Sequence, residues 1–89
     1  MAVVWVPTQM RELTGGRNTV TVSGATLRQV ISDLERQFPG FRERLVHDDR
    51  VNPTLSVIID GGIASMGLME RVEEKSEISF VPAIGGGRQ

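Results

Sequence analysis

One stretch of this sequence has the clear apolar spacing of a helix, and it limits the folds open to the chain. Thr26 and Gln29 fit a capping box, in which the hydroxyl satisfies one free amide and the glutamine reaches back to another. Pro39 and Gly40 end the segment. Between these signals one apolar stripe recurs at helical spacing: Leu27, Val30, Ile31, Leu34 and Phe38. We therefore predict one amphipathic helix that begins at Thr26 and buries this stripe.

Short β-rich runs stand on both sides of this helix. Their boundaries are Ala2–Val6, Asn18–Val22, Leu55–Ile59 and Ile78–Val81. Pro7 and Pro82 stop the first and last runs, while the dipeptide Asp60-Gly61 after the third run favours a tight hairpin turn. The first two runs, joined through Thr14-Gly15-Gly16, predict a hairpin with a long connection.

The remaining segments predict smaller elements. Phe41 and Leu45 stand four residues apart, which indicates one more helical turn packed on the main helix. The polar segment from His47 to Pro53 predicts a loop. Residues 62–75 lack a clear period, so we expect irregular structure there with room for one short strand.

This order of elements predicts an α+β fold of the β-grasp type, a mixed sheet clasping one main helix. In that topology the first and last strands are parallel, central neighbours, which suits their apolar content. A ferredoxin-like alternative requires a second long helix, and we find none. We expect residues 1–84 to form the β-grasp domain and residues 85–89 to form a flexible glycine-rich tail.

Composition excludes several kinds of chemistry. The chain has no cysteine, so it offers no thiol nucleophile, disulfide or thiolate metal site, and its one histidine, His47, lies in a polar stretch. Ten basic and eleven acidic side chains give a net charge of −1, which argues against nucleic-acid binding. No apolar run is long enough to span a membrane. We predict a cytoplasmic protein without catalytic residues, bound metal or bound cofactor.

The first strand has two apolar faces. Val4 and Val6 point one way and Val3 and Trp5 the other, because side chains alternate along a strand. A single helix layer covers only one face. The face of Trp5 and Val3 is therefore either a partner-docking patch or covered by the loops around Met66 and Met69.

The C-terminal segment after Pro82 contains Gly85, Gly86 and Gly87 in succession. It is either a frayed end without function or a thin segment that enters a narrow channel in a partner. Ordering each residue costs roughly 1–2 kcal/mol, so such a partner must supply backbone hydrogen bonds. The residues alone do not separate these alternatives.

Several motifs of the chain, taken in order, resemble the MoaD/ThiS family of ubiquitin-like sulfur carriers. The similarity spans nearly the whole sequence, and within the family it is greatest to the CysO-type carriers, whose thiocarboxylate feeds cysteine synthesis. The motifs are Val6-Pro7-Thr8 through Arg11-Glu12-Leu13-Thr14-Gly15-Gly16, Val22-Ser23-Gly24-Ala25-Thr26-Leu27, Phe38-Pro39-Gly40, Arg44-Leu45 and Val81-Pro82-Ala83-Ile84.

This resemblance implies a chemistry located on the main chain. An ATP-using, ubiquitin-activating-like adenylyltransferase and sulfurtransferase would activate the terminal glycine as an acyl-adenylate, and a sulfur donor would then leave a thiocarboxylate. Gly86 and Gly87 match the family's diglycine. Gly87 is thus the expected site of adenylation and of sulfur, with Gly85 and Gly86 recognised as part of the tail. The carrier itself would catalyse nothing.

Arg88 and Gln89 depart from the family pattern, since they place the Gly87 carboxyl in a peptide bond. Either a protease, by resemblance a zinc metalloprotease of the JAMM type, cleaves between Gly87 and Arg88, or this chain does not work by thiocarboxylate. The sulfur acceptor would be an enzyme of the cysteine synthase type. The alternatives are the small subunit of molybdopterin synthase, with the large subunit as acceptor, a ubiquitin-like protein modifier, and a β-grasp interaction domain with an inert tail.

Overall fold

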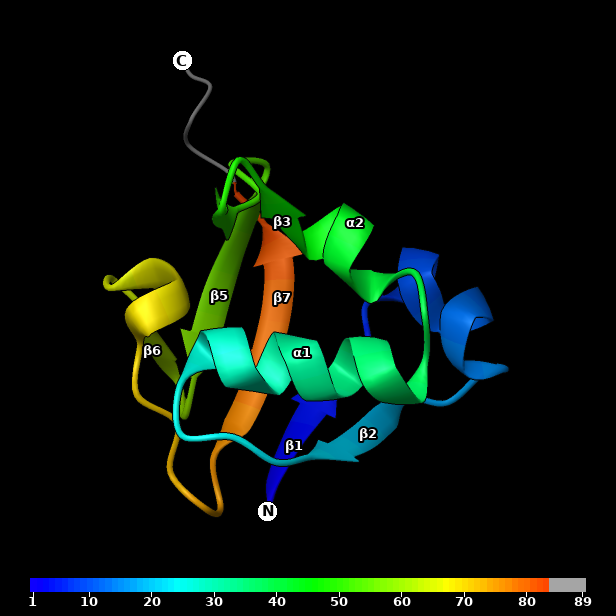
Figure 1. Ribbon diagram of the computed structural model, residues 1–89, viewed down its shortest axis with the longest axis horizontal. Coiled ribbons are helices and arrows are strands. Elements are labelled where there is room, and N and C mark those ends of the chain that lie inside the picture. The colour runs from blue at the N-terminus through cyan, green and yellow to red at the C-terminus, as the bar shows by residue number, and fades with distance from the viewer. Residues whose placement is uncertain (84–89) are drawn as a thin grey trace.

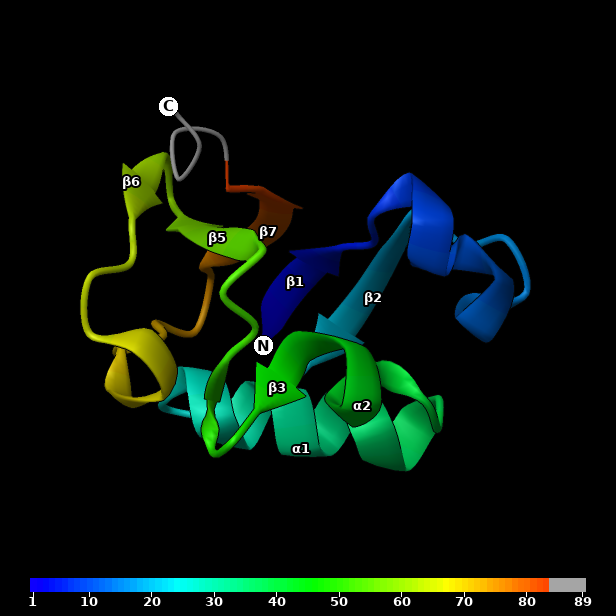
Figure 2. The same cartoon turned by 90° about the horizontal axis from the view of Figure 1, so that it is seen from above.

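The computed structural model describes residues 1–83 (Figure 1). A mixed sheet forms one layer, and the α-helices lie against one of its faces (Figures 1 and 2). The elements in chain order are β1 (Ala2–Trp5), the 3-10 helix η1 (Thr8–Thr14), β2 (Thr19–Val22), α1 (Leu27–Gln37), α2 (Phe41–Leu45), β3 (Val46–His47), β4 (Arg50–Val51), β5 (Leu55–Ile59), β6 (Gly62–Ile63), the 3-10 helix η2 (Gly67–Met69) and β7 (Glu77–Pro82).

The sheet has the strand order β2-β1-β7-β5-β6. β1 and β7, the first and last strands of the chain, are parallel neighbours, and β7 also pairs with β5 in the antiparallel sense. The hairpin of β1 and β2 is antiparallel, as is that of β5 and β6. The predicted β-grasp topology, with its parallel first and last strands, is confirmed. Asp60 and Gly61 both have positive φ, 51° and 84°, which confirms the tight turn between β5 and β6.

Helix α1 begins as the sequence predicts. The Thr26 hydroxyl accepts a hydrogen bond from the Gln29 amide at 3.3 Å. The Gln29 side chain reaches back to the amide of Ala25, at 2.7 Å, one residue before the position of an ideal capping box. Phe38, just past the end of the helix, is half-buried. The other four residues of the predicted stripe are buried against the sheet: Leu27, Val30, Ile31 and Leu34.

The second helical turn is also confirmed, because Phe41 and Leu45 of α2 are completely buried. The Glu35 carboxylate of α1 accepts hydrogen bonds from the backbone amides of Gly40 and Arg42, at 3.2 and 2.8 Å. These bonds satisfy amides at the start of α2 and hold it beside the end of α1.

Two expectations about the connections were wrong or incomplete. Residues 47–53 are not a loop throughout, because β3 and β4 pair there as a short hairpin. The turn uses positive φ at two consecutive aspartates, Asp48 and Asp49, which accept this conformation more readily than most residues. The connection between β1 and β2 contains the 3-10 helix η1, which buries Met10 and Thr14. Residues 62–75 contain β6 and η2, in agreement with a mostly irregular segment.

Side chains of α1 cover the outer edge of β2. Gln37 Nε2 donates to the carbonyl of Thr21 at 2.9 Å, and the amide of Ser23 donates to the Asp33 carboxylate at 3.0 Å. Asp33 also accepts from Arg36 at 2.6 Å. The hydrogen bond from Arg36, with that from Ser23, lowers the pKa of Asp33 below its usual value. This edge strand is therefore partly blocked by its own helix.

Candidate functional site

The predicted tail residues Gly85, Gly86, Gly87 and Arg88 lie outside the residues that the structure describes. Their roles in adenylation, recognition and cleavage therefore stay predictions, as does the boundary between a domain of residues 1–84 and a tail of residues 85–89. The structure does describe the base of this segment, where β7 ends. The sheet face next to that base holds the predicted patch of Trp5 and Val3.

The base of the tail is fixed by β5 and the turn before it. Leu55 lies opposite Pro82 in the register of β5 and β7. The amide of Ala83 then donates to the carbonyl of Thr54 at 2.9 Å. Asn52 holds this turn, since its Oδ1 accepts from the Thr54 amide at 2.9 Å and its Nδ2 donates to the carbonyl of Arg44 at 2.9 Å. The end of β7, as far as Ala83, is therefore fixed in position.

Sequence reasoning did not identify Asn52 as part of this site. The only signal was the turn-forming Asn-Pro-Thr sequence at 52–54. The long-range bond from Asn52 to Arg44 depends on how α2 packs, which no local pattern gives. Asn52 thus connects the end of α2 to the turn that binds the end of β7.

The sheet face away from the helices, here named the open face, carries a row of side chains that runs across the strands. Trp5 lies opposite Ser79, and Ser79 lies opposite Ile58, which in turn lies opposite Ile63. Trp5 is 46% exposed and Ile63 is 76% exposed. Val3 is half-buried on the same face. The predicted orientation of Trp5 and Val3 away from the core is confirmed, whereas their role in docking is a prediction.

The open face continues to the base of the tail. Val81, at 37% exposure, lies on β7 two residues before Ala83 and opposite Ser56 of β5. Ile58, Ile63 and Val81 were not named as site residues from the sequence. The alternation of buried Ile78 and Phe80 with Ser79 and Val81 is the signal that could have placed Val81 on this face.

The tryptophan is held in place on this face by its polar edge. Trp5 Nε1 donates a hydrogen bond to Glu77 Oε1 at 3.0 Å. The Glu77 amide donates to Asp60 Oδ1 at 2.9 Å, which ties the start of β7 to the turn between β5 and β6. The indole N–H is thereby satisfied, and the apolar ring stays available for contact with a partner.

The alternative in which loops around Met66 and Met69 cover Trp5 is wrong. η2 lies on the helix side of the sheet, next to α1 (Figures 1 and 2). Leu68 is the residue of this turn that enters the core, because Met66 and Met69 remain 65% and 66% exposed. The open face therefore keeps its apolar side chains accessible.

Among residues 1–83, no cluster of three or more histidine or acidic side chains is arranged to hold a metal ion. None of the helices there is both long and apolar enough to cross a membrane.

Comparison with known proteins identifies the family. The ThiS family model matches residues 4–87. The chain belongs to the ThiS family. The predicted resemblance is confirmed. The family match includes all three tail glycines and ends before Arg88.

The relatives of this ThiS-family chain sharpen the assignment. The sulfur carrier protein CysO of Mycobacterium tuberculosis is 33% identical over 89 residues, covering 94% of this chain and 96% of the relative. The CysO of the Amycolatopsis orientalis BexX/CysO complex has a TM-score of 0.89 and 29% identity, over 98% of this chain and all of that one. These relatives confirm the predicted β-grasp fold and the sulfur-carrier role.

A more distant structural likeness concerns the fold alone. The small archaeal modifier protein 1 of Methanosarcina acetivorans has a TM-score of 0.77 at 19% identity, covering 97% of this chain and 95% of that one. The β-grasp fold is therefore shared with proteins named as modifiers as well as with sulfur carriers.

Proposed function

We propose that this ThiS-family chain carries sulfur as a thiocarboxylate on Gly87, formed after removal of Arg88 and Gln89, and that the sulfur supplies cysteine biosynthesis. The observation that carries the proposal is the extent of the family match, which reaches residue 87 and stops before Arg88. The CysO relatives favour cysteine biosynthesis over the alternative of a molybdopterin synthase small subunit.

The chemistry needs an activating partner, because a carboxylate is a poor electrophile. In the proposed reaction, a Gly87 carboxylate oxygen attacks the α-phosphorus of ATP, and pyrophosphate leaves. Sulfide (HS⁻) then attacks the carbonyl carbon, so that a C–S bond forms and the C–O bond to AMP breaks; AMP leaves, and loss of the S–H proton gives the thiocarboxylate. The partner enzyme supplies both steps and the ATP, and the carrier holds no cofactor. The cytoplasm, where ATP is available, is the proposed location of the reaction.

The described part of the chain supports this role by presenting the tail. The bond from Ala83 to Thr54 fixes where the chain leaves the sheet, and the accessible apolar side chains of Trp5 and Val81 lie on the face that leads to this point. A ubiquitin-activating-like adenylyltransferase bound to the open face would thus meet the chain that follows β7. Val3 would extend the same contact.

Two further partners complete the proposal. A protease of the JAMM metalloprotease type would cleave the bond between Gly87 and Arg88 and expose the carboxylate. A cysteine-synthase-type enzyme would accept the sulfur. A molybdopterin synthase large subunit as acceptor, or joining of Gly87 to a lysine of a target protein, are the competing outcomes.

The test is the intact mass of the untagged protein isolated from its own host. Loss of Arg88 and Gln89 lowers the mass by about 284 Da, and exchange of a terminal oxygen for sulfur raises it by about 16 Da. We expect both changes. A Gly87→Val variant should show neither the sulfur increment nor ATP consumption with the activating enzyme. An unchanged full-length mass, with enzyme and protease co-expressed, would instead support an interaction domain with an inert tail.

A further inference from the structure

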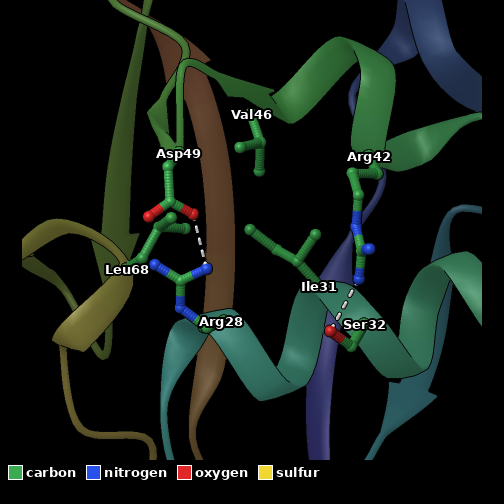
Figure 3. Close-up of a pocket in the computed structure, with 7 residues that line it drawn as sticks. All are labelled: Arg28, Ile31, Ser32, Arg42, Val46, Asp49 and Leu68. Carbon is green, nitrogen blue, oxygen red and sulfur yellow. Dashed lines mark hydrogen bonds and ion pairs between the residues drawn. The ribbon is translucent and has the colours of Figure 1, made fainter.

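A separate cavity lies on the helix side of the sheet, opposite the open face (Figure 3). Its volume is about 250 Å³. Five elements or turns contribute to it, namely α1, α2, β3, the turn between β3 and β4, and η2. The lining residues are Arg28, Ile31, Ser32, Arg42, Val46, Asp49 and Leu68.

The floor of this cavity is apolar. Ile31 and Leu68 are buried members of the core, and Val46 packs against the core while half-buried. In Figure 3 the Ile31 side chain points into the space between the two arginines. An apolar group placed against this floor would be removed from water where it contacts these side chains, which favours binding roughly in proportion to the apolar area covered.

The rim of the cavity carries two guanidinium groups with unequal partners. Arg28 Nη1 pairs with the Asp49 carboxylate at 2.7 Å. Arg42 Nη2 donates only to the neutral hydroxyl of Ser32, at 2.7 Å. Among residues 1–83 no carboxylate lies within ion-pair distance of the Arg42 guanidinium. The rim therefore holds two positive charges against one negative charge, on a chain whose net charge is −1.

We propose that this cavity anchors an acidic segment of a partner protein, with an apolar side chain on the floor and a neighbouring carboxylate paired with Arg42. A guanidinium has five donors in a planar fork, and Arg42 uses one of them on Ser32. The carboxylate would therefore add to the existing bond without displacing it.

The size and lining of the cavity favour a peptide over other anions. Its volume is below the range of roughly 300–1,000 Å³ typical of small-molecule sites, so it suits one or two side chains better than a whole ligand. The apolar floor of Ile31, Val46 and Leu68 gives a bare inorganic anion no contact. The lining comes from residues 28–68, so occupation of the cavity does not depend on the chemistry of Gly87.

The test is a titration of the full-length, isotope-labelled protein followed by nuclear magnetic resonance. The probe is the blocked dipeptide of phenylalanine and glutamate, and its matched control replaces glutamate by glutamine. We expect amide shifts at Ile31, Ser32 and Leu68, with the glutamine dipeptide binding about threefold more weakly, since an exposed ion pair has an effect of this order. Equal binding of the two dipeptides, or the absence of shifts at these amides, would overturn the proposal.

Two matched variants distinguish an effect of the cavity arginine from an effect of the overall charge of the protein. Arg42→Gln removes the rim cation, whereas Arg36→Gln removes an exposed arginine that pairs with Asp33 outside the cavity. We expect Arg42→Gln to weaken glutamate-dipeptide binding about threefold and Arg36→Gln to leave it unchanged, with folding of both variants verified by thermal unfolding. Equal losses would overturn the proposal. Equal shifts with inorganic phosphate alone would also overturn it, by assigning the cavity to a free anion.

Discussion

The two faces of the sheet are made by alternate residues of the same strands, yet they differ in what covers them. On β7, Ile78 and Phe80 are 0% and 5% exposed beneath the helices. Ser79 and Val81, their neighbours in sequence, lie on the open face, and Val81 is 37% exposed. One face thus supplies stability through burial, while the other keeps apolar side chains exposed and is the face that we propose contacts a partner. The two roles are therefore separable by substitution along a single strand.

The largest effect should come from a matched pair of isoleucines. Ile78→Ala removes a completely buried side chain and should lower the free energy of unfolding by about 2–5 kcal/mol. Ile58→Ala, on the half-buried open face of the adjacent strand, should cost about 1 kcal/mol, since only part of the area is lost. Urea denaturation of both variants measures the difference. Equal costs would mean that the open face is part of the core.

The next effect concerns the affinity for a partner. Trp5→Ala should lower the free energy of unfolding by about 1 kcal/mol, because the side chain is only half-buried and its one hydrogen bond, to Glu77, is exposed. It should weaken binding of the activating enzyme by about 2 kcal/mol, as expected for an aromatic residue at the centre of an interface. Thermal unfolding measures the change in stability, and calorimetric titration measures the change in affinity for the activating enzyme. Trp5→Phe, which keeps an apolar ring but loses the bond to Glu77, is the control.

A smaller effect is expected at the start of the covering helix. Thr26→Ala removes the hydroxyl that accepts from the Gln29 amide and should destabilise the protein by about 1 kcal/mol. Thr26→Ser retains the hydroxyl and should recover most of this loss. Partner binding to the open face should be the same in both variants once they are folded. A drop in affinity would show that the two faces are coupled.

The smallest effect depends on pH. The pKa of Asp33 is lowered in the folded protein, so its contribution to stability is complete above its unfolded-state pKa of about 3.9 and is lost as pH falls through the folded value. Asp33→Asn should therefore cost less than about 1 kcal/mol near pH 7 and nothing in strong acid. Thermal unfolding from pH 7 to pH 2 compares the stability of the Asp33→Asn variant with that of the parent protein. A constant difference at every pH would argue against this titration.

The sequence was sufficient to predict an element of the fold where a local signal and the topology agreed. The threonine at 26, the apolar stripe of α1 and the dipeptide Asp60-Gly61 each fixed one element, and the order of elements fixed the parallel pairing of β1 and β7. The hairpin of β3 and β4 could not be predicted in this way. Its strands have two residues each, and its stability depends on contacts such as Arg28 with Asp49, which lie 21 residues apart.

The candidate site was only partly predictable for a similar reason. Alternation along β1 placed Trp5 and Val3 on the open face correctly. The bond from Trp5 to Glu77, 72 residues away, and that from Asn52 to Arg44 arise only once the sheet and α2 are assembled. The run of tail glycines contains no local pattern that predicts a role, and their proposed role rests on the family resemblance.

The position of β7 between β1 and β5 has a mechanical consequence. A partner that draws the segment after Ala83 into a narrow channel pulls along the axis of β7. Its ladders to a parallel strand on one side and an antiparallel strand on the other are then loaded in shear, with many hydrogen bonds sharing the force. A strand at the edge of the sheet would instead peel away one bond at a time. In the proposed reaction, the sheet would therefore stay folded while the activating enzyme pulls on the end of the chain.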